Sequence, residues 1–252
     1  MIIIHSNAVN GLFAFNTRTG DNQLSIMPLS LPLITRTEQV RQAILQQILS
    51  GELRPGERLL EARLSSQFGV SQATVNAALQ DLHNQGMVTK LLNRSTSVSR
   101  YTLLDIERIF VVRSALEPTA ARILAQAWSE AVHITLRDHV DEMRRAARAK
   151  DLACFCVADY TFHQDIYRLS GNSFLMQAGH AIAAAPFAYV LCDHLEALPT
   201  DYLSLAEDHQ GMIRAMQEGP EEAARVTAHF IAEWRGHSRR ALSTVPAETG
   251  SS

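Results

Sequence analysis

Four side chains in the second half of the chain have the types and spacing of metal ligands. Asp159 and His163 lie four residues apart, so on a helix both leave the same face. His209 and His229 lie on either side of Gly219, each ten residues away from it. If two antiparallel helices meet at this glycine, both histidines reach the same level, about 15 Å from the turn. One carboxylate and three imidazoles would then converge inside a helical bundle.

One oxygen and three nitrogen donors suit Zn²⁺, Ni²⁺ or another first-row divalent ion, with positions left for water or a ligand. The same residues also fit a plainer interpretation, in which core histidines are hydrogen-bonded to Asp159 and to the backbone without a metal. Spacing alone favours this second interpretation, so both stay open at this point.

The elements that must position these residues are predicted to be helices. Thr102-x-x-Asp105 has the form of a capping box, and the helix that follows carries Arg113 and Glu117. Pro118 is expected to kink or divide this helix, because proline supplies no N–H. Further helices are expected at residues 128–149, 152–169, 173–196, 201–218 and 220–242. Residues 101–242 would thus form an all-helical domain, and residues 243–252 a flexible tail.

Residues 35–100 have the pattern of a winged helix-turn-helix. Thr35-x-x-Glu38 resembles a capping box at the start of a first helix, and Phe68-Gly69-Val70-Ser71 has the form of a tight turn between the second and third helices. Two strands, 87–90 and 97–99, would form the wing. Residues 1–34 show no sustained period and are expected to be an N-terminal leader, with disorder as one alternative.

The third helix has the features of a recognition helix. Gln72, Asn76, Gln80 and His83 form one outward stripe when the apolar side chains point inward. Amide side chains can form paired hydrogen bonds with adenine in the major groove, although any surface helix also carries such residues. The candidate DNA-binding residues are Arg63, Ser71, Gln72, Thr74, Asn76 and Arg94.

Composition and charge agree with two domains of different roles. The 252 residues are 46% hydrophobic, which is sufficient for two cores. Residues 36–100 carry a net charge of +3 and residues 101–252 a net charge of −6, which fits a DNA reader joined to a module that avoids phosphates. The surplus of +3 also fits an ordinary solvated surface. Three cysteines without a Cys-x-x-Cys pair give neither a disulfide framework nor a structural zinc site.

The sequence predicts a cytoplasmic protein with no membrane partner. The N-terminus lacks a basic segment followed by an apolar core of signal-peptide length. The most apolar run, residues 174–192, is interrupted by Gln177, His180 and Pro186, so it falls short of a clean membrane span.

About 65 residues of the first domain resemble the winged helix-turn-helix of GntR-type transcription regulators. The resemblance rests on the runs Ile48-Leu49-Ser50-Gly51-Glu52-Leu53-Arg54-Pro55-Gly56-Glu57-Arg58-Leu59, Leu64-Ser65-Ser66-Gln67-Phe68-Gly69-Val70-Ser71, Ala78-Leu79-Gln80-Asp81-Leu82 and Gly86-Met87-Val88. The chain departs from the family where arginines are usual and Gln72 and Asn76 stand instead, and where wing glycines are replaced by Arg94 and Ser95. We therefore expect an operator richer in A·T contacts than is usual for the family.

The second domain resembles the all-helical FCD effector domain that follows such winged helices. The resemblance rests on Arg113-x-x-x-Glu117, Asp159-x-x-Phe162-His163, Ser170-Gly171-Asn172, Asp208-His209 and Ala228-His229. Carried over residue by residue, the family's metal ligands become Asp159, His163, His209 and His229. The resemblance thus favours the metal site over the plainer interpretation.

Two further residues are candidates for effector binding. Arg113 can receive a carboxylate through its planar, paired donors, or it can pair with Glu117 on its own helix. Asn172 is a second candidate, although an asparagine at this position more often caps the next helix.

The sequence therefore predicts a mainly α protein with a winged helix-turn-helix followed by a helical bundle. We expect a homodimeric transcription regulator that binds double-stranded operator DNA under the control of a small organic acid held at a divalent metal. One alternative is a metal-dependent enzyme that uses the same four ligands, although no separate general base is evident. Another is a DNA-binding protein whose metal is purely structural.

Overall fold

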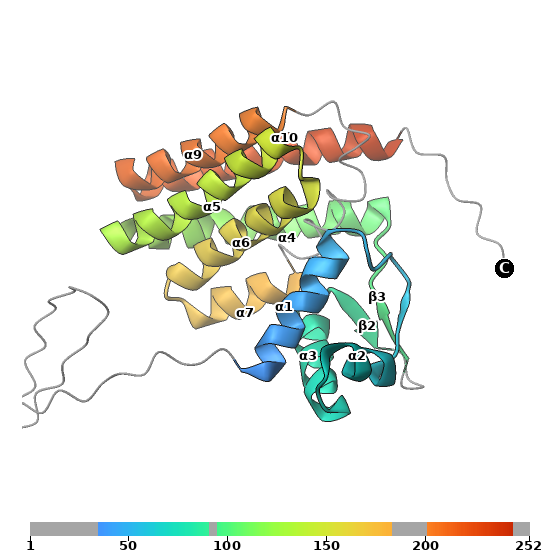
Figure 1. The fold of residues 1–252 in the computed structure, drawn as a ribbon. Helices are drawn as coiled ribbons and strands as arrows, with labels where there is room; N and C mark the ends of the chain where they lie inside the picture. Colours follow the sequence, from blue (N-terminus) through green and yellow to red (C-terminus); the bar gives the residue numbers. More distant parts are fainter. Residues whose placement is uncertain (1–34, 91–94, 183–200, 244–252) are drawn as a thin grey trace, which may run out of the picture. The chain divides into compact units, whose positions relative to one another are not determined.

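The computed structural model describes residues 35–90, 95–182 and 201–243, and these residues are mainly helical (Figure 1). The predicted fold class is confirmed. The leader expected at residues 1–34, the wing residue Arg94 and residues 244–252 lie outside the described residues. Among the helices that are described, none combines the length and the apolar character needed to cross a membrane.

The first domain is a winged helix-turn-helix, as predicted. Its elements are α1 (Arg36–Leu49), β1 (Arg58–Leu59), α2 (Glu61–Phe68), α3 (Gln72–Asn84), β2 (Val88–Lys90) and β3 (Thr96–Val98). Gly69 ends α2 in the left-handed region with φ 62°, which a residue without Cβ adopts at little cost. Ser71 begins α3 by accepting a hydrogen bond from the Thr74 N–H.

The wing is an antiparallel three-stranded sheet with the order β1-β3-β2. Thr96 of the central strand β3 pairs with Leu59 of β1 on one side and with Lys90 of β2 on the other. The sequence did not predict β1, because two residues are too few to establish a period. The core of this domain contains fully buried side chains of α1 and α3, among them Ile44, Val75 and Leu79. These residues recur at helical spacing and hold α1 against α3.

Within the residues that the structure describes, six further helices follow the wing. They are α4 (Leu103–Gln126), α5 (Glu130–Ala149), α6 (Leu152–Leu169), α7 (Ser173–Ile182), α9 (Tyr202–Glu218) and α10 (Pro220–Ser243). The predicted capping box at Thr102 and Asp105 is present at the start of α4. The rest of the helix expected at residues 173–196 lies outside the described residues after Ile182.

Pro118 does not divide the helix, since α4 continues through this residue. A proline removes only its own N–H, which leaves the carbonyl of Ser114 without its usual helical donor. Ser114 and Pro118 both line a surface pocket, so water can reach this side of the helix. The contact between α4 and α10 runs along both halves of α4, with ion pairs at Arg122 and Glu107.

The bundle places four helices around the candidate site. Helices α9 and α10 form a hairpin at Gly219, and α10 lies antiparallel along α4 (Figure 1). Two ion pairs mark the ends of the α4–α10 contact, Arg122 with Glu221 at 2.7 Å and Arg235 with Glu107 at 2.8 Å. Helix α5 packs on both α6 and α9. The inner faces of α4, α6, α9 and α10 therefore meet in one buried core.

Candidate metal centre and DNA-binding face

Three of the four predicted ligands converge in the bundle core. Asp159 and His163 leave the same face of α6, as their spacing predicts, and His209 approaches them from α9. The Nε2 atom of His209 lies 2.9 Å from Asp159 Oδ1 and 3.3 Å from His163 Nε2. All three side chains are buried, and one ligand atom from each lies within 4.8 Å of the others.

A hydrogen bond to the backbone fixes which nitrogen of His209 carries the proton. Nδ1 of His209 lies 2.8 Å from the carbonyl oxygen of Leu205, which can only accept, so this nitrogen donates. Nδ1 of His163 lies 2.7 Å from Glu117 Oε1, an ion-pair contact that lacks hydrogen-bond geometry. In a neutral His209 ring Nε2 is therefore unprotonated, and it faces His163 Nε2 and Asp159 Oδ1. A bound cation, or a proton on His163 Nε2, can satisfy the acceptors that meet here.

Glu117 contacts His163, a contact that the sequence does not predict. Its Oε2 accepts from Arg113 Nε at 2.6 Å, its Oε1 lies 2.7 Å from His163 Nδ1, and it is fully buried. Sequence spacing related Glu117 only to Arg113 on its own helix. The packing of α4 against α6 adds the second partner. A carboxylate that fixes the outer nitrogen of a metal-ligating histidine is a common second layer of metal sites.

Electrostatics keeps the carboxylates of this cluster ionised. Burial alone would raise the pKa of Glu117, but the charge of Arg113 and the contact with His163 outweigh it and lower the pKa to about 2. Burial also opposes ionisation of Asp159, yet the contact with His209 and the nearby charge of Arg113 bring its pKa below the ordinary value. For His163, burial and the nearby Arg113 lower the pKa, which disfavours the imidazolium.

The fourth predicted ligand, His229, is not part of the cluster. Its side chain is 68% exposed, and its Nε2 lies 3.3 Å from Glu233 Oε1 on the same helix. Equal distance from Gly219 fixes the level of a residue along the hairpin but not the face on which it lies. At this level the inward position belongs to Phe230, whose ring lies 4.9 Å from that of His209 and 5.7 Å from that of His163.

The three remaining groups fit a divalent ion. Two ligand atoms about 2.1 Å from one tetrahedral ion lie about 3.4 Å apart. The separations among Asp159 Oδ1, His163 Nε2 and His209 Nε2 are 2.9, 3.3 and 3.7 Å, so small side-chain shifts suffice. Two nitrogens and one oxygen are the donor set of an open site, which retains positions for water or a ligand.

The two candidate effector residues are both engaged within the protein. Arg113 is fully buried and holds Glu117 with two nitrogens, Nε at 2.6 Å and Nη2 at 3.4 Å. The side-chain oxygen of Asn172 accepts from the N–H groups of Phe174 and Leu175 and thereby caps α7. In both cases the structure shows the local alternative that the sequence left open.

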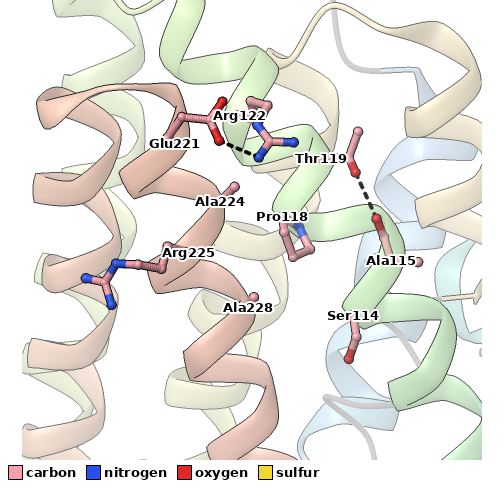
Figure 2. Close-up of a pocket in the computed structure, with 9 residues that line it drawn as sticks. All are labelled: Ser114, Ala115, Pro118, Thr119, Arg122, Glu221, Ala224, Arg225 and Ala228. Carbon is pink, nitrogen blue, oxygen red and sulfur yellow. Dashed lines mark hydrogen bonds and ion pairs between the residues drawn. The ribbon is translucent and has the colours of Figure 1, made fainter.

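A separate pocket of about 530 Å³ lies between α4 and α10 on the surface of the bundle. Figure 2 shows Pro118, Ala224 and Ala228 along it, with the Arg122–Glu221 ion pair at one end. No predicted effector or metal ligand lines this pocket. It is thus distinct from the cluster of Asp159, His163 and His209.

The candidate DNA-binding residues that the structure describes lie on or beside α3. Arg63, Gln72 and Asn76 are exposed. Ser71 and Thr74 are joined by a hydrogen bond between their hydroxyl oxygens, 2.9 Å apart, at the start of the helix. A helix N-terminus with exposed polar groups can approach a phosphate or a base edge.

Comparisons with known proteins agree with this arrangement of domains. Residues 36–98 match the profile of the bacterial regulatory proteins of the gntR family, and residues 108–232 match the FCD domain. A probable D-xylose utilization operon transcriptional repressor of Paenarthrobacter nicotinovorans is 28% identical over 205 residues, which cover 80% of this chain and 89% of the relative. An uncharacterized HTH-type transcriptional regulator from the TAR-I ttuE-ttuC' intergenic region of Agrobacterium vitis is 30% identical over 135 residues, 52% of this chain and 78% of the relative.

Among solved structures, the E. coli protein McbR/YncC superposes with a TM-score of 0.66 and 20% identity. The match covers 84% of this chain and 98% of that protein, and it supports the fold. These relatives are transcription regulators, not enzymes, so the comparisons decide against the enzyme alternative. The chain belongs to the GntR family of transcription regulators, with a winged helix-turn-helix followed by an FCD domain.

Proposed function

We propose that this regulator binds operator DNA under the control of a small organic acid, which binds at a divalent metal held by Asp159, His163 and His209. The observation that carries the proposal is the convergence of one carboxylate and two imidazoles in a buried site, with Nδ1 of His209 held by the Leu205 carbonyl and Nδ1 of His163 next to Glu117. A carboxylate ligand would complete the coordination of the ion. The ion would supply the positive charge that retains the acid inside the bundle.

The coupling to DNA follows from the helices that carry the ligands. Asp159 and His163 lie on α6, which also packs against α1 of the winged helix. The hydroxyl of Tyr160, the neighbour of Asp159, donates to Gln85 Oε1 at 3.4 Å, and Gln85 is the C-cap residue of α3. An acid that prefers one position of α6 shifts the population of one arrangement of the DNA-binding domain, because only differential affinity moves an equilibrium.

We further propose that the chain acts as a homodimer in the cytoplasm. Two winged helices related by a two-fold axis fit two half-sites of a near-palindromic operator. The proposed units are residues 35–100 for DNA binding and residues 101–242 for metal and effector binding. The name of the Paenarthrobacter relative, a repressor of D-xylose utilization, supports control of a catabolic operon.

Metal binding is tested by calorimetry. Zn²⁺ and Ni²⁺ are titrated into chelator-stripped protein, first the wild type and then Asp159→Asn and His229→Ala. We expect Asp159→Asn to lose at least tenfold in metal affinity and His229→Ala to bind as the wild type does. Equal losses in both variants would indicate the four-ligand set that the family resemblance implies, and no loss in either would refute the site.

Effector control is tested by a gel shift with metal-loaded protein and a duplex selected from a random library. A panel of sugar acids, lactate and dicarboxylates is added, with D-xylose as an uncharged comparison. The proposal is supported if an acid changes the fraction of bound duplex and the sugar does not. A metal that raises the melting temperature while no acid changes DNA binding would instead favour a purely structural metal.

A further inference from the structure

The recognition helix carries an amide side chain that is hydrogen-bonded to a carboxylate of the preceding helix. Asn76, in the second turn of α3, donates from Nδ2 to Glu61 Oε1 at 2.6 Å. Glu61 lies in the first turn of α2, so the contact joins the two helices of the helix-turn-helix (Figure 1). Asn76 is exposed and Glu61 is half-buried, so the pair lies at the surface of the DNA-binding domain.

The chemistry of the partner fixes the orientation of the amide. An ionised carboxylate only accepts hydrogen bonds, so Asn76 must turn its NH₂ group to Glu61. The oxygen Oδ1 then remains for a base, together with one N–H. The second oxygen of Glu61 adds another acceptor and a full negative charge beside this position. The pair therefore presents more acceptor than donor character to the major groove.

Base edges in the major groove differ in what they offer to such a pair. Adenine and cytosine present exocyclic amino donors, whereas guanine presents two acceptors and thymine one acceptor and a methyl group. Next to the Glu61 carboxylate, an acceptor on the base is repelled, while an amino group is attracted. Discrimination that includes a repulsive element rejects the wrong partners as well as favouring the right one.

We propose that Glu61 is a specificity-determining residue of the operator site. It orients Asn76 and makes the base that Asn76 reads an adenine or a cytosine, at the cost of some affinity for DNA in general. The inference concerns the DNA-binding domain and needs neither the metal nor an effector. It rests on the placement of α3 in the major groove, which the Asn76→Ala variant below tests separately.

A second amide of the recognition helix, that of Gln80, contacts a positively charged group instead of a carboxylate. Gln80 accepts from Lys90 Nζ of β2 at 2.9 Å and donates from Nε2 to Asn84 Oδ1 at 3.2 Å. The ammonium group favours phosphates or acceptor-bearing bases near Gln80. The charge of Glu61 is therefore a local feature of the position of Asn76, and its effect is expected at one base pair of each half-site.

The test is a binding-site selection from a randomised duplex library, followed by competition binding with single-base variants of the selected duplex. The proteins are the full-length wild type, Glu61→Gln, Glu61→Ala and Asn76→Ala. Glu52→Gln is the matched control, because Glu52 also accepts from an amide, Gln47 Nε2 at 3.0 Å, on an exposed part of the same domain. Melting temperatures show that each variant is folded.

The position that Asn76 reads is the one at which Asn76→Ala loses discrimination. There the wild type is expected to prefer adenine or cytosine, and Glu61→Gln is expected to accept guanine or thymine about fivefold better, the scale of one base-edge hydrogen bond. Binding of Glu61→Gln to unrelated duplex should also tighten, because a negative charge facing DNA is removed. The Glu52→Gln control should change neither.

Four results would overturn the inference. The first is that Asn76→Ala leaves the base preference unchanged at every position. The second is that the wild type requires guanine or thymine at the position that Asn76 reads. The third is that Glu61→Gln and Glu61→Ala keep the base preference of the wild type. Finally, both variants can lose affinity uniformly across all sequences, which is the outcome of a merely structural contact between α2 and α3.

Discussion

Replacing Glu117 by glutamine removes the counter-charge of a fully buried arginine while keeping the size of the side chain. Arg113 and Glu117 both have 0% exposed side chains, and the Nε–Oε2 distance is 2.6 Å. Breaking a buried ion pair by removing one partner costs about 3–5 kcal/mol, because the remaining charge stays desolvated. Asp159 contributes some compensation from nearby, so we expect a loss of about 3 kcal/mol in the free energy of unfolding.

The assay is urea or thermal unfolding of the metal-free protein, with Glu221→Gln as the control. The Glu221–Arg122 pair has a similar N–O distance, 2.7 Å, but its side chains are 83% and 43% exposed, so its loss should cost less than about 1 kcal/mol. At about 2–4 °C per kcal/mol, the two variants should differ by several degrees in melting temperature.

The reasoning also predicts an effect on metal binding. Without the Glu117 carboxylate, His163 loses the negative charge 2.7 Å from its Nδ1, so metal affinity should fall about 10- to 100-fold. A variant with both charges replaced by apolar residues, Arg113→Met with Glu117→Leu, should recover part of the lost stability. Equal destabilisation by Glu117→Gln and Glu221→Gln, with unchanged metal affinity, would refute the account of this buried network.

Three further predictions concern acid stability, packing and metal removal. Burial opposes ionisation of Asp165, but hydrogen bonds from His139 and Arg168 lower its pKa below 3.8. The stability that this carboxylate contributes is therefore present above pH 3.8 and is lost as the pH falls further. In acid unfolding curves, Asp165→Asn should make the free energy of unfolding depend less on pH below about pH 4 than Asp138→Asn does. A Cβ on Gly179 would lie 2.6 Å from Cγ of the buried Tyr167 ring, so Gly179→Ala should cost about 1–3 kcal/mol by denaturation, whereas Gly211→Ala, with no atom nearer than 3.8 Å, should be neutral or stabilising. A chelator should lower the melting temperature of metal-loaded wild type by roughly 5–10 °C if the metal is present at about 100 times its Kd, and it should leave Asp159→Asn unchanged.

The sequence predicts those parts of the fold that depend on local signals. The helix at residues 152–169 has the bounds that the structure shows, because Asp151 caps its start and Ser170-Gly171 follows its end. The turn at Gly69 and the cap at Ser71 are equally local. Strand β1 was missed because its two residues become a strand only by pairing with β3. Pro118 does not divide its helix, and the packing of α4 along α10 is a tertiary contact that no local signal encodes.

In the candidate site, too, local spacing predicts some residues and helix packing determines the others. Asp159 and His163 share a helix, so their spacing alone places them on one face. His209 and His229 lie on different helices, and their agreement in level does not determine the rotation of α10. Phe230 takes the inward position because the buried positions of α10 include Thr227, Ile231 and Trp234. The bridging role of Glu117 depends on α4 packing against α6, which no local pattern encodes.

The most direct test of the central claim is the affinity for operator DNA of zinc-loaded wild type and zinc-treated Asp159→Asn, measured by fluorescence anisotropy with and without each acid of the panel. The account predicts that at least one acid changes the Kd of the wild type about fivefold or more, the usual lower range of allosteric coupling. The same acid should leave Asp159→Asn unaffected, while that variant still binds the duplex. An acid response of equal size in both proteins, or none in either, would contradict control through this metal centre.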